Sequence, residues 1–170
     1  MRIIDSILNV FLGDKGKKDV KEVTPIVNSI LIIEKDLKNV SNDDLRSITN
    51  SFKKEKQELK NPFYEKIEKI KETINQSENI DENEKRYNEI EKVENNYLDS
   101  LDKYLDSILP KAFAVIKETT KRFNNNSEII VKSTPFDEKI SSNKTYVKLN
   151  GDNAIWSNSW DAAGKKIVWD

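Results

Sequence analysis

The chain contains no cysteine and no histidine among its 170 residues. Their absence excludes disulfide bonds, thiol nucleophiles, imidazole bases and the usual nitrogen and sulfur ligands of zinc. Glycine and proline are also scarce, at four each, and no apolar run approaches the roughly eighteen residues of a membrane span. The short apolar start lacks the small-residue cleavage site of a secretory signal peptide. Few options for side-chain chemistry remain, and we predict no catalytic, cofactor-binding or metal site in this chain.

Charged residues are abundant and balanced in sign. The 30 acidic and 29 basic residues give a net charge of −1, and charged residues make up 35% of the chain. A balanced charge creates no overall field that would draw in nucleic acid, so no nucleic-acid partner is expected. A chain that is rich in charge and poor in glycine and proline is typical of long, solvated helices. We therefore predict a mainly α-helical protein of the α+β class.

The first part of the chain has the periodicity of helices. Residues 1–12 place apolar side chains at helical spacing, and Gly13 is predicted to end this helix in a basic linker that reaches Lys18. The apolar residues of 25–37 are too dense for one stripe, which predicts a central helix. Ser41 and the two aspartates that follow indicate the start of a third helix, because serine caps free amide groups and carboxylates complement the helix dipole.

The Lys/Glu/Asn-rich segment 53–107 is predicted to insert a long antiparallel helical hairpin. Asn61 and Pro62 indicate a break before its first arm, and Pro110 indicates the start of a further helix after its second. We interpret the hairpin as a solvated spacer, with a partner-docking surface as the alternative. Its two arms share a narrow apolar seam formed by Phe63, Ile67, Ile70, Ile74, Tyr87, Ile90, Tyr97, Leu98, Leu101, Leu105 and Ile108. The helix from Pro110 is expected to pack through Phe113, Ile116, Thr120 and Phe123.

After residue 126 the apolar period changes to two, which predicts a small antiparallel β-sheet in 124–170. Asn150-Gly151 between two alternating runs is a strong hairpin signal, because both central residues of a type I′ turn need positive φ. Four aromatic residues are expected to form the core of this sheet, with stacking on bases or binding of a peptide as the alternative: Tyr146, Trp156, Trp160 and Trp169. The chain stops at Asp170 in mid-strand, which suggests a fragment.

Several short blocks resemble the SecA family, the ATP-driven motors of bacterial preprotein translocation. Residues 1–11 and 26–30 resemble the start of that family, and residues 45–52 resemble its Leu-Arg-x-Lys-Thr-x-x-Phe helix with Ile48 in place of lysine. The segment 108–118, followed by Lys121 and Arg122, is similar to the family's Leu-Pro-Glu-Ala-Phe-Ala-Val block, apart from Lys111. The resemblance covers roughly residues 1–52 and 107–123, and both the hairpin and the β-rich segment are insertions relative to compact family members.

The resemblance implies the amino-terminal region of a motor that drives preproteins through the SecYEG channel. The glycines at 13, 16, 151 and 164 cannot supply a phosphate-binding loop, so the chain alone should be inactive as an ATPase and should hold no cofactor. ATP and magnesium are expected for the full-length parent. The implied partners are SecYEG, an anionic phospholipid surface and preprotein, with a homodimer left open. The implied location is cytoplasmic, and peripheral on the cytoplasmic face of the cell membrane.

The amino-terminal helix is the candidate docking element. An amphipathic helix buries its apolar face at the headgroup boundary, and lysines beside it attract anionic lipid. The residues alone favour a helix packed on its own domain and followed by a solvated linker, whereas the resemblance favours docking. The candidate membrane- or channel-docking residues are Arg2, Ile3, Ile4, Ile7, Leu8, Phe11, Lys15, Lys17 and Lys18.

These expectations divide the chain into three regions. Residues 1–18 form the amphipathic helix and basic linker, 19–123 form a helical region that contains the inserted hairpin 53–107, and 124–170 form the β-rich segment. In this division the chain supplies docking and structural support rather than catalysis. The alternative function is a stand-alone helical protein-interaction module with no motor activity.

Overall fold

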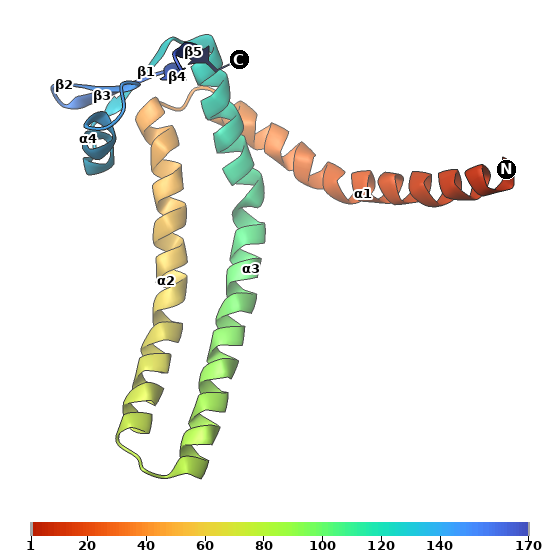
Figure 1. Cartoon of the computed structure of the whole chain (residues 1–170), viewed down its shortest axis with the longest axis vertical. Helices are drawn as coiled ribbons and strands as arrows, with labels where there is room; N and C mark the ends of the chain where they lie inside the picture. Colours follow the sequence, from red (N-terminus) through yellow and green to blue (C-terminus); the bar gives the residue numbers. More distant parts are fainter. Residues whose placement is uncertain (1, 170) are drawn as a thin grey trace. The chain divides into compact units, whose positions relative to one another are not determined.

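The computed structural model describes residues 2–169, with side chains at residue 16 and from residue 18 onward. Figure 1 shows long helices followed by two small antiparallel sheets, which confirms the mainly helical α+β class. The helices are α1 (Arg2–Leu37), α2 (Asn42–Asn75), α3 (Ile80–Asn125) and α4 (Pro135–Ser141). The strands are β1 (Glu128–Lys132), β2 (Val147–Asn150), β3 (Asn153–Ser157), β4 (Ser159–Ala162) and β5 (Lys165–Val168).

The chain divides into two compact units. The first unit contains residues 1–45 and 110–170, and thus α1, the sheets and the last part of α3. The second unit contains residues 46–109, which form most of α2 and the first part of α3.

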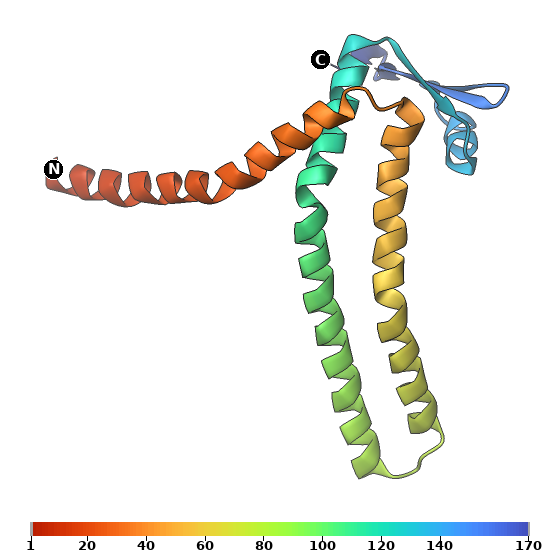
Figure 2. The ribbon, with the colours of Figure 1, turned by 180° about the vertical axis from the view of Figure 1, so that it is seen from behind.

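The second unit is an antiparallel helical hairpin, whose two arms lie side by side in Figures 1 and 2. Ile67, Ile70 and Ile74 of α2 pack with Ile90 and Val93 of α3 in one buried cluster. The expected contact between the arms is therefore confirmed. The apolar seam follows from the spacing of three and four residues, which keeps these side chains on one face of each helix.

The buried seam is narrower than the sequence predicts. Tyr87, Leu98 and Leu105, which we expected to face the first arm, are exposed to solvent. Apolar residues spread over more than one helix face cannot all reach a single partner helix, so the residues nearest the contact line are buried and the others are not.

The helices run through the residues that were predicted to interrupt them. No break occurs at Gly13, Pro62 or Pro110, because α1, α2 and α3 each continue past these positions. A proline inside a helix removes one hydrogen bond and costs about 3 kcal/mol. Apolar contacts on either side can outweigh that cost, and Leu59 and Phe63 on either side of Pro62 are both partly buried.

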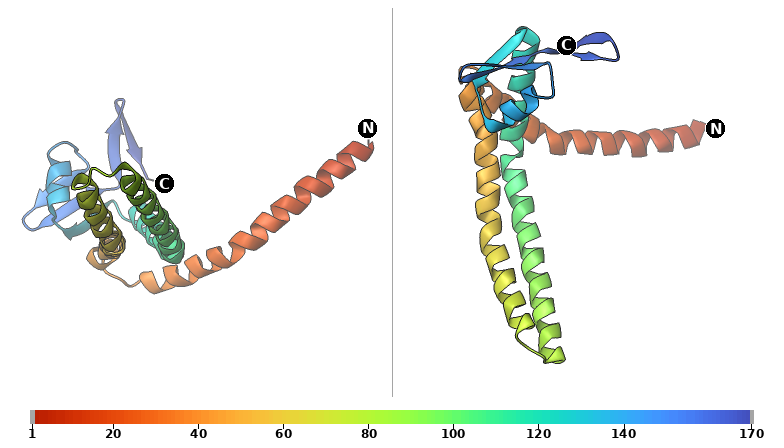
Figure 3. Two further views of the ribbon diagram at one scale, coloured as in Figure 1. Left: turned by 90° about the horizontal axis from the view of Figure 1, so that it is seen from below. Right: turned by 60° about the vertical axis from the view of Figure 1, so that its left-hand side comes forward.

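The β-rich segment forms a three-stranded antiparallel sheet in the order β1-β3-β2 and a separate ribbon of β4 and β5, the dark blue end of the chain in Figure 3. The hairpin at Asn150 is confirmed, but its loop is Gly151-Asp152 rather than Asn150-Gly151. Only Gly151 of this loop has a positive φ, of 54°, as in a type II′ turn with glycine first. The β4–β5 loop is the one with two positive φ values, 49° at Ala163 and 75° at Gly164.

The short helix α4, which the sequence analysis did not predict, is fastened by a buried carboxylate. Asp137 is 0% exposed, and its Oδ2 accepts hydrogen bonds from the backbone N and Oγ1 of Thr134 at 2.9 and 2.7 Å. Its Oδ1 accepts one from Nε1 of Trp156 at 2.9 Å. Because a buried carboxylate needs such partners, this contact fixes α4 against β3. The Trp156 ring also contacts Phe136 and Tyr146, as expected for a residue of the sheet core. Trp169 is 48% exposed, so the expected role in the core is wrong for this residue.

Candidate functional site: the amino-terminal helix and its anchor

Only one of the predicted docking residues has a described side chain. Lys18 is exposed, with its Nζ 3.9 Å from Oε1 of Glu22. A pair of this kind between exposed side chains contributes little free energy, so the ammonium group stays accessible to an anionic surface. The side chains of Arg2, Ile3, Ile4, Ile7, Leu8, Phe11, Lys15 and Lys17 lie outside the described residues.

The part of α1 that follows Lys18 exposes an apolar strip to solvent. Its members are spaced by three and four residues, which places them on one helix face. Their exposed fractions run from 40% to 66%, and they are Val20, Val23, Val27 and Leu31. The prediction of a central helix over 25–37 is therefore wrong, since only Leu37 of this segment is buried. The many apolar residues of this segment make its burial favourable, but the composition does not specify whether the same chain or another molecule buries it.

The carboxyl end of α1 is attached to α3 by an ion pair. Nζ of Lys117 lies 2.7 Å from Oε2 of Glu34, and the Glu34 side chain is mostly buried. The hydrogen bond from Lys117 holds the pKa of Glu34 below its ordinary value of 4.5. A carboxyl whose pKa is lowered by folding stabilises the folded state above its ordinary pKa, and this contribution is lost as the pH falls through the folded-state pKa.

We expect the Lys117→Met variant to move the pKa of Glu34 back toward its ordinary value, because the variant removes the hydrogen bond and the positive charge. An NMR titration of the Glu34 side-chain carboxyl in both proteins measures this shift. An unchanged titration curve would show that the contact with Lys117 does not hold α1 in solution.

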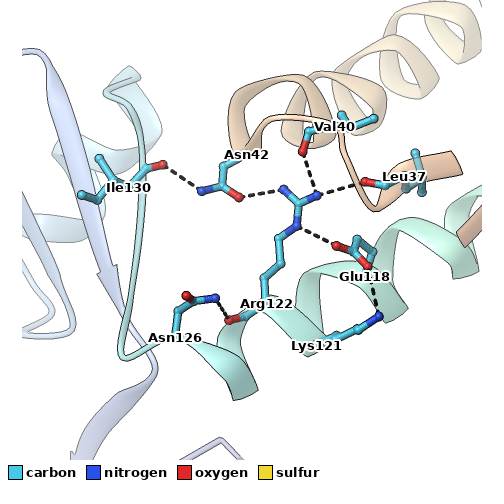
Figure 4. A network of polar contacts seen from close by, with 8 residues as sticks. All are labelled: Leu37, Val40, Asn42, Glu118, Lys121, Arg122, Asn126 and Ile130. Carbon is cyan, nitrogen blue, oxygen red and sulfur yellow. Dashed lines mark hydrogen bonds and ion pairs between the residues drawn. The ribbon is translucent and has the colours of Figure 1, made fainter. Parts of the chain in front are cut away.

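Arg122 of α3 binds the polar groups at the base of α1 (Figure 4). Its Nη2 donates to the carbonyl oxygens of Leu37 and Val40, at 3.0 and 2.8 Å. Its Nη1 donates to Oδ1 of Asn42 at 2.7 Å, and its Nε donates to Oε1 of Glu118 at 2.8 Å. One guanidinium thus joins the end of α1, the α1–α2 connection, the first residue of α2 and the preceding turn of α3. Guanidinium suits this role because its donors are held in one rigid plane.

The same network reaches the three-stranded sheet. Nδ2 of Asn42 donates to the carbonyl oxygen of Ile130 at 3.3 Å, as Figure 4 shows. Oδ1 of Asp43 accepts a hydrogen bond from the backbone N of Lys132 at 2.7 Å. The start of α2 is therefore tied to β1 through two neighbouring side chains, and through Asn42 to Arg122.

Both charges at the centre of the network are withdrawn from solvent. The side chains of Arg122 and Glu118 are 14% and 4% exposed. Oε2 of Glu118 has no hydrogen-bond partner and lies 4.0 Å from Nζ of Lys121. A buried ion pair has lost its hydration. Substitution of only one of its two residues therefore leaves the other charge buried and uncompensated. We call this cluster of Leu37, Val40, Asn42, Glu118 and Arg122 the Arg122 anchor.

A second feature of the first unit is an apolar pocket of about 540 Å³ beside the two sheets. The rings of Trp160 and Trp169 lie edge to face at 6.0 Å, and Phe123 lies 6.5 Å from Trp169. The remaining lining residues are Lys144, Tyr146, Trp156 and Ser157. The described residues contain no cluster of three acidic side chains that could hold a metal ion, and in the same part of the chain no helix is long and apolar enough to cross a membrane.

Comparison with known proteins identifies the family. The family model of the SecA DEAD-like domain matches residues 8–147. The chain belongs to the SecA family. Curated relatives called protein translocase subunit SecA, from Christiangramia forsetii and Flavobacterium psychrophilum, are each 44% identical over all 170 residues. The subunit from Porphyromonas gingivalis strain W83 is 35% identical over 96% of the chain. The chain spans about 15% of the length of these relatives, and no solved structure matches it.

The helix that follows Pro110 packs only in part through the predicted face, because Thr120 and Phe123 are partly buried and Phe123 lies beside Trp169. Phe113 and Ile116 are more than half exposed, whereas Ala114, Val115 and Glu118 are buried. The sequence analysis counted Arg122 only as part of the SecA resemblance and did not predict the anchor. The signal was Glu118 followed by Arg122 four residues later, a spacing that brings opposite charges together on one helix face. This spacing is usually found on solvated faces, so it does not by itself indicate a buried pair.

Proposed function

We propose that this chain is the amino-terminal region of a SecA motor that drives ATP-dependent preprotein translocation through the SecYEG channel. In this proposal the region docks the motor to the membrane or channel and supports its structure, and it takes no part in catalysis. ATP and magnesium would bind elsewhere in the parent protein. Membership of the SecA family supports the motor, and the printed name of the relatives, protein translocase subunit, supports the transport process.

The exposed apolar strip of α1 is the observation that carries the docking role. Burial of this strip in a membrane or a protein surface is favourable, since each fully buried side chain of this size contributes about 1.5–3 kcal/mol to the binding free energy. The strip consists of Val20, Val23, Val27 and Leu31. Lys18 and Lys21, both exposed, lie near its amino-terminal end and would add about 1 kcal/mol each near an anionic leaflet. The Arg122 anchor holds the other end of α1, so a helix bound at the membrane would remain attached to the first unit. In this proposal the protein lies in the cytoplasm and peripherally on the cytoplasmic face of the membrane.

We expect the chain to co-sediment with vesicles that contain phosphatidylglycerol and not with vesicles of phosphatidylcholine alone. Deletion of residues 1–18 should abolish binding, and Val27→Asp should weaken it severalfold, because a charge in the apolar strip opposes insertion. Leu149→Asp is the matched control, since Leu149 on β2 is as exposed as Val27. Unchanged binding after the deletion would rule out residues 1–18 as the anchor, and unchanged binding of Val27→Asp would rule out the apolar strip of α1.

The stand-alone helical interaction module is the less favoured alternative. The relatives that align with the whole length of the chain carry the name of a translocase subunit. A module without motor function would also retain the exposed strip of α1, but it would have no reason to prefer anionic lipid. The comparison between the two kinds of vesicle therefore separates the two functions.

A further inference from the structure

The second arm of the hairpin carries a second exposed apolar surface, which takes no part in the hairpin seam. Tyr87, Leu98 and Leu105 of α3 are 60%, 53% and 44% exposed. They are separated by eleven and seven residues, so on a helix that turns about 100° per residue they point within about 20° of one direction. Ile80, seven residues before Tyr87, continues the same line and is also exposed. We call these four residues the α3 stripe.

The seam of the hairpin lies on a different side of α3. Ile90 and Val93 are buried against α2, and at the same helical turn they lie about 60° and 120° away from Tyr87. The buried residues of the seam supply the apolar contact between the two arms. The α3 stripe is therefore not needed to hold the arms together.

The charged side chains on the α3 stripe and on its side remote from the seam are all acidic. On the stripe and on its side remote from the seam, the charged side chains within about 120° of Tyr87 are acidic and exposed: Asp81, Glu84, Glu91, Glu94, Asp99, Asp102 and Asp106. The lysines of this arm, at 85, 92 and 103, lie about 140–160° away. The stripe and its side remote from the seam are therefore acidic, whereas the opposite side of the arm carries these lysines together with Glu82 and Glu89.

We propose that the α3 stripe docks a basic amphipathic helix of a partner protein. The apolar side chains of the stripe accept the apolar face of a second helix, and the exposed Glu94, which lies on the line between Tyr87 and Leu98, would pair with a cation in that face. Lysine or arginine along one flank of that helix would lie opposite the acidic rim on the side remote from the seam, as complementary charges flank the seam of a coiled coil. The carboxylates reject an anionic membrane, and they also oppose pairing of two α3 stripes, because a two-fold contact would place like charges opposite each other. This site is distinct from the membrane docking proposed for α1.

The test uses the full chain and a synthetic helical peptide of about 20 residues, long enough to form a helix on binding. The peptide carries leucines at heptad spacing with lysines along one flank, and a second peptide carries glutamates in place of the lysines. We expect the lysine peptide to bind at low ionic strength in a fluorescence anisotropy titration and to bind more weakly at high salt, because exposed charges are screened. The glutamate peptide should not bind.

The variant Leu98→Asp/Leu105→Asp should weaken binding of the lysine peptide at least tenfold, since each buried leucine contributes about 1.5–3 kcal/mol. Its matched control is Asn96→Asp/Ser107→Asp, which adds the same charge to exposed positions on another face of the same arm and should leave binding unchanged. Far-ultraviolet circular dichroism checks that both variants remain helical.

The proposal is overturned if both peptides bind equally, or if neither binds. It is also overturned if Leu98→Asp/Leu105→Asp leaves binding of the lysine peptide unchanged. If the wild-type chain is a dimer and this variant is a monomer, the stripe binds a second copy of the chain instead. If the wild-type chain binds vesicles through the stripe and this variant does not, the stripe binds a membrane instead.

Discussion

Replacing Arg122 with methionine is expected to lower the free energy of unfolding of the first unit by about 3–5 kcal/mol. Methionine retains much of the apolar stem but removes every donor of the guanidinium. The carboxylate of Glu118, 4% exposed, loses its hydrogen bond and its compensating charge. The carbonyl oxygens of Leu37 and Val40 lose a shared donor at the same time.

The three tryptophans make this effect measurable, because all of them lie in the first unit. Urea unfolding followed by tryptophan fluorescence therefore reports on the unit that contains the Arg122 anchor. The matched control is Lys121→Met, which removes a more exposed charge 4.0 Å from the same carboxylate and should cost less than about 1 kcal/mol. Adding Glu118→Gln to Arg122→Met should recover part of the loss, since a neutral side chain no longer buries a charge. Equal stability of Arg122→Met and the wild type would contradict the anchor.

The second large effect is expected in the hairpin, where Ile67→Ala should cost about 2–5 kcal/mol. Ile67 is 4% exposed and lies in the buried cluster of α2 and α3. A cluster of five buried residues has few neighbours that can move to fill the cavity, so most of the lost contact energy is not regained. Urea unfolding followed by far-ultraviolet circular dichroism, with amide hydrogen exchange over residues 63–97, measures the change.

Ile80→Ala is the matched control, because it deletes the same atoms from a side chain that is 82% exposed. This substitution should change the stability of the hairpin by less than about 0.5 kcal/mol. If Ile67→Ala and Ile80→Ala had equal effects, the two arms would not pack through the observed seam.

The hairpin shows how far periodicity alone can predict structure. The spacing of Ile67, Ile70 and Ile74 predicted both the helix and its contact with the second arm, and both are confirmed. Periodicity did not separate Leu98 and Leu105 from the buried residues, because it shows which side chains share a face and not which face meets a partner. The same limit applies to Phe113 and Ile116, which the sequence predicted as a packing face and the structure leaves exposed.

The ends of the helices could not be predicted from single residues such as proline, because they also depend on tertiary packing. Pro62 and Pro110 are strong helix-breaking residues on their own, yet α2 and α3 run through them. Whether a helix ends at a proline depends on the packing of the segments on both sides. That packing involves residues far away in the sequence.

The sequence by itself determined the class of the fold, the antiparallel hairpin, the site of the β2–β3 turn and the resemblance to the SecA family, because these depend on residue spacing and on short blocks of sequence. The tertiary structure alone decided that Arg122 and Glu118 are buried, and that α1 and α3 leave apolar faces in water. A charged pair four residues apart is compatible with a solvated face and with a buried one. Only the approach of Leu37, Val40 and Asn42 withdraws this pair from water and makes it an anchor.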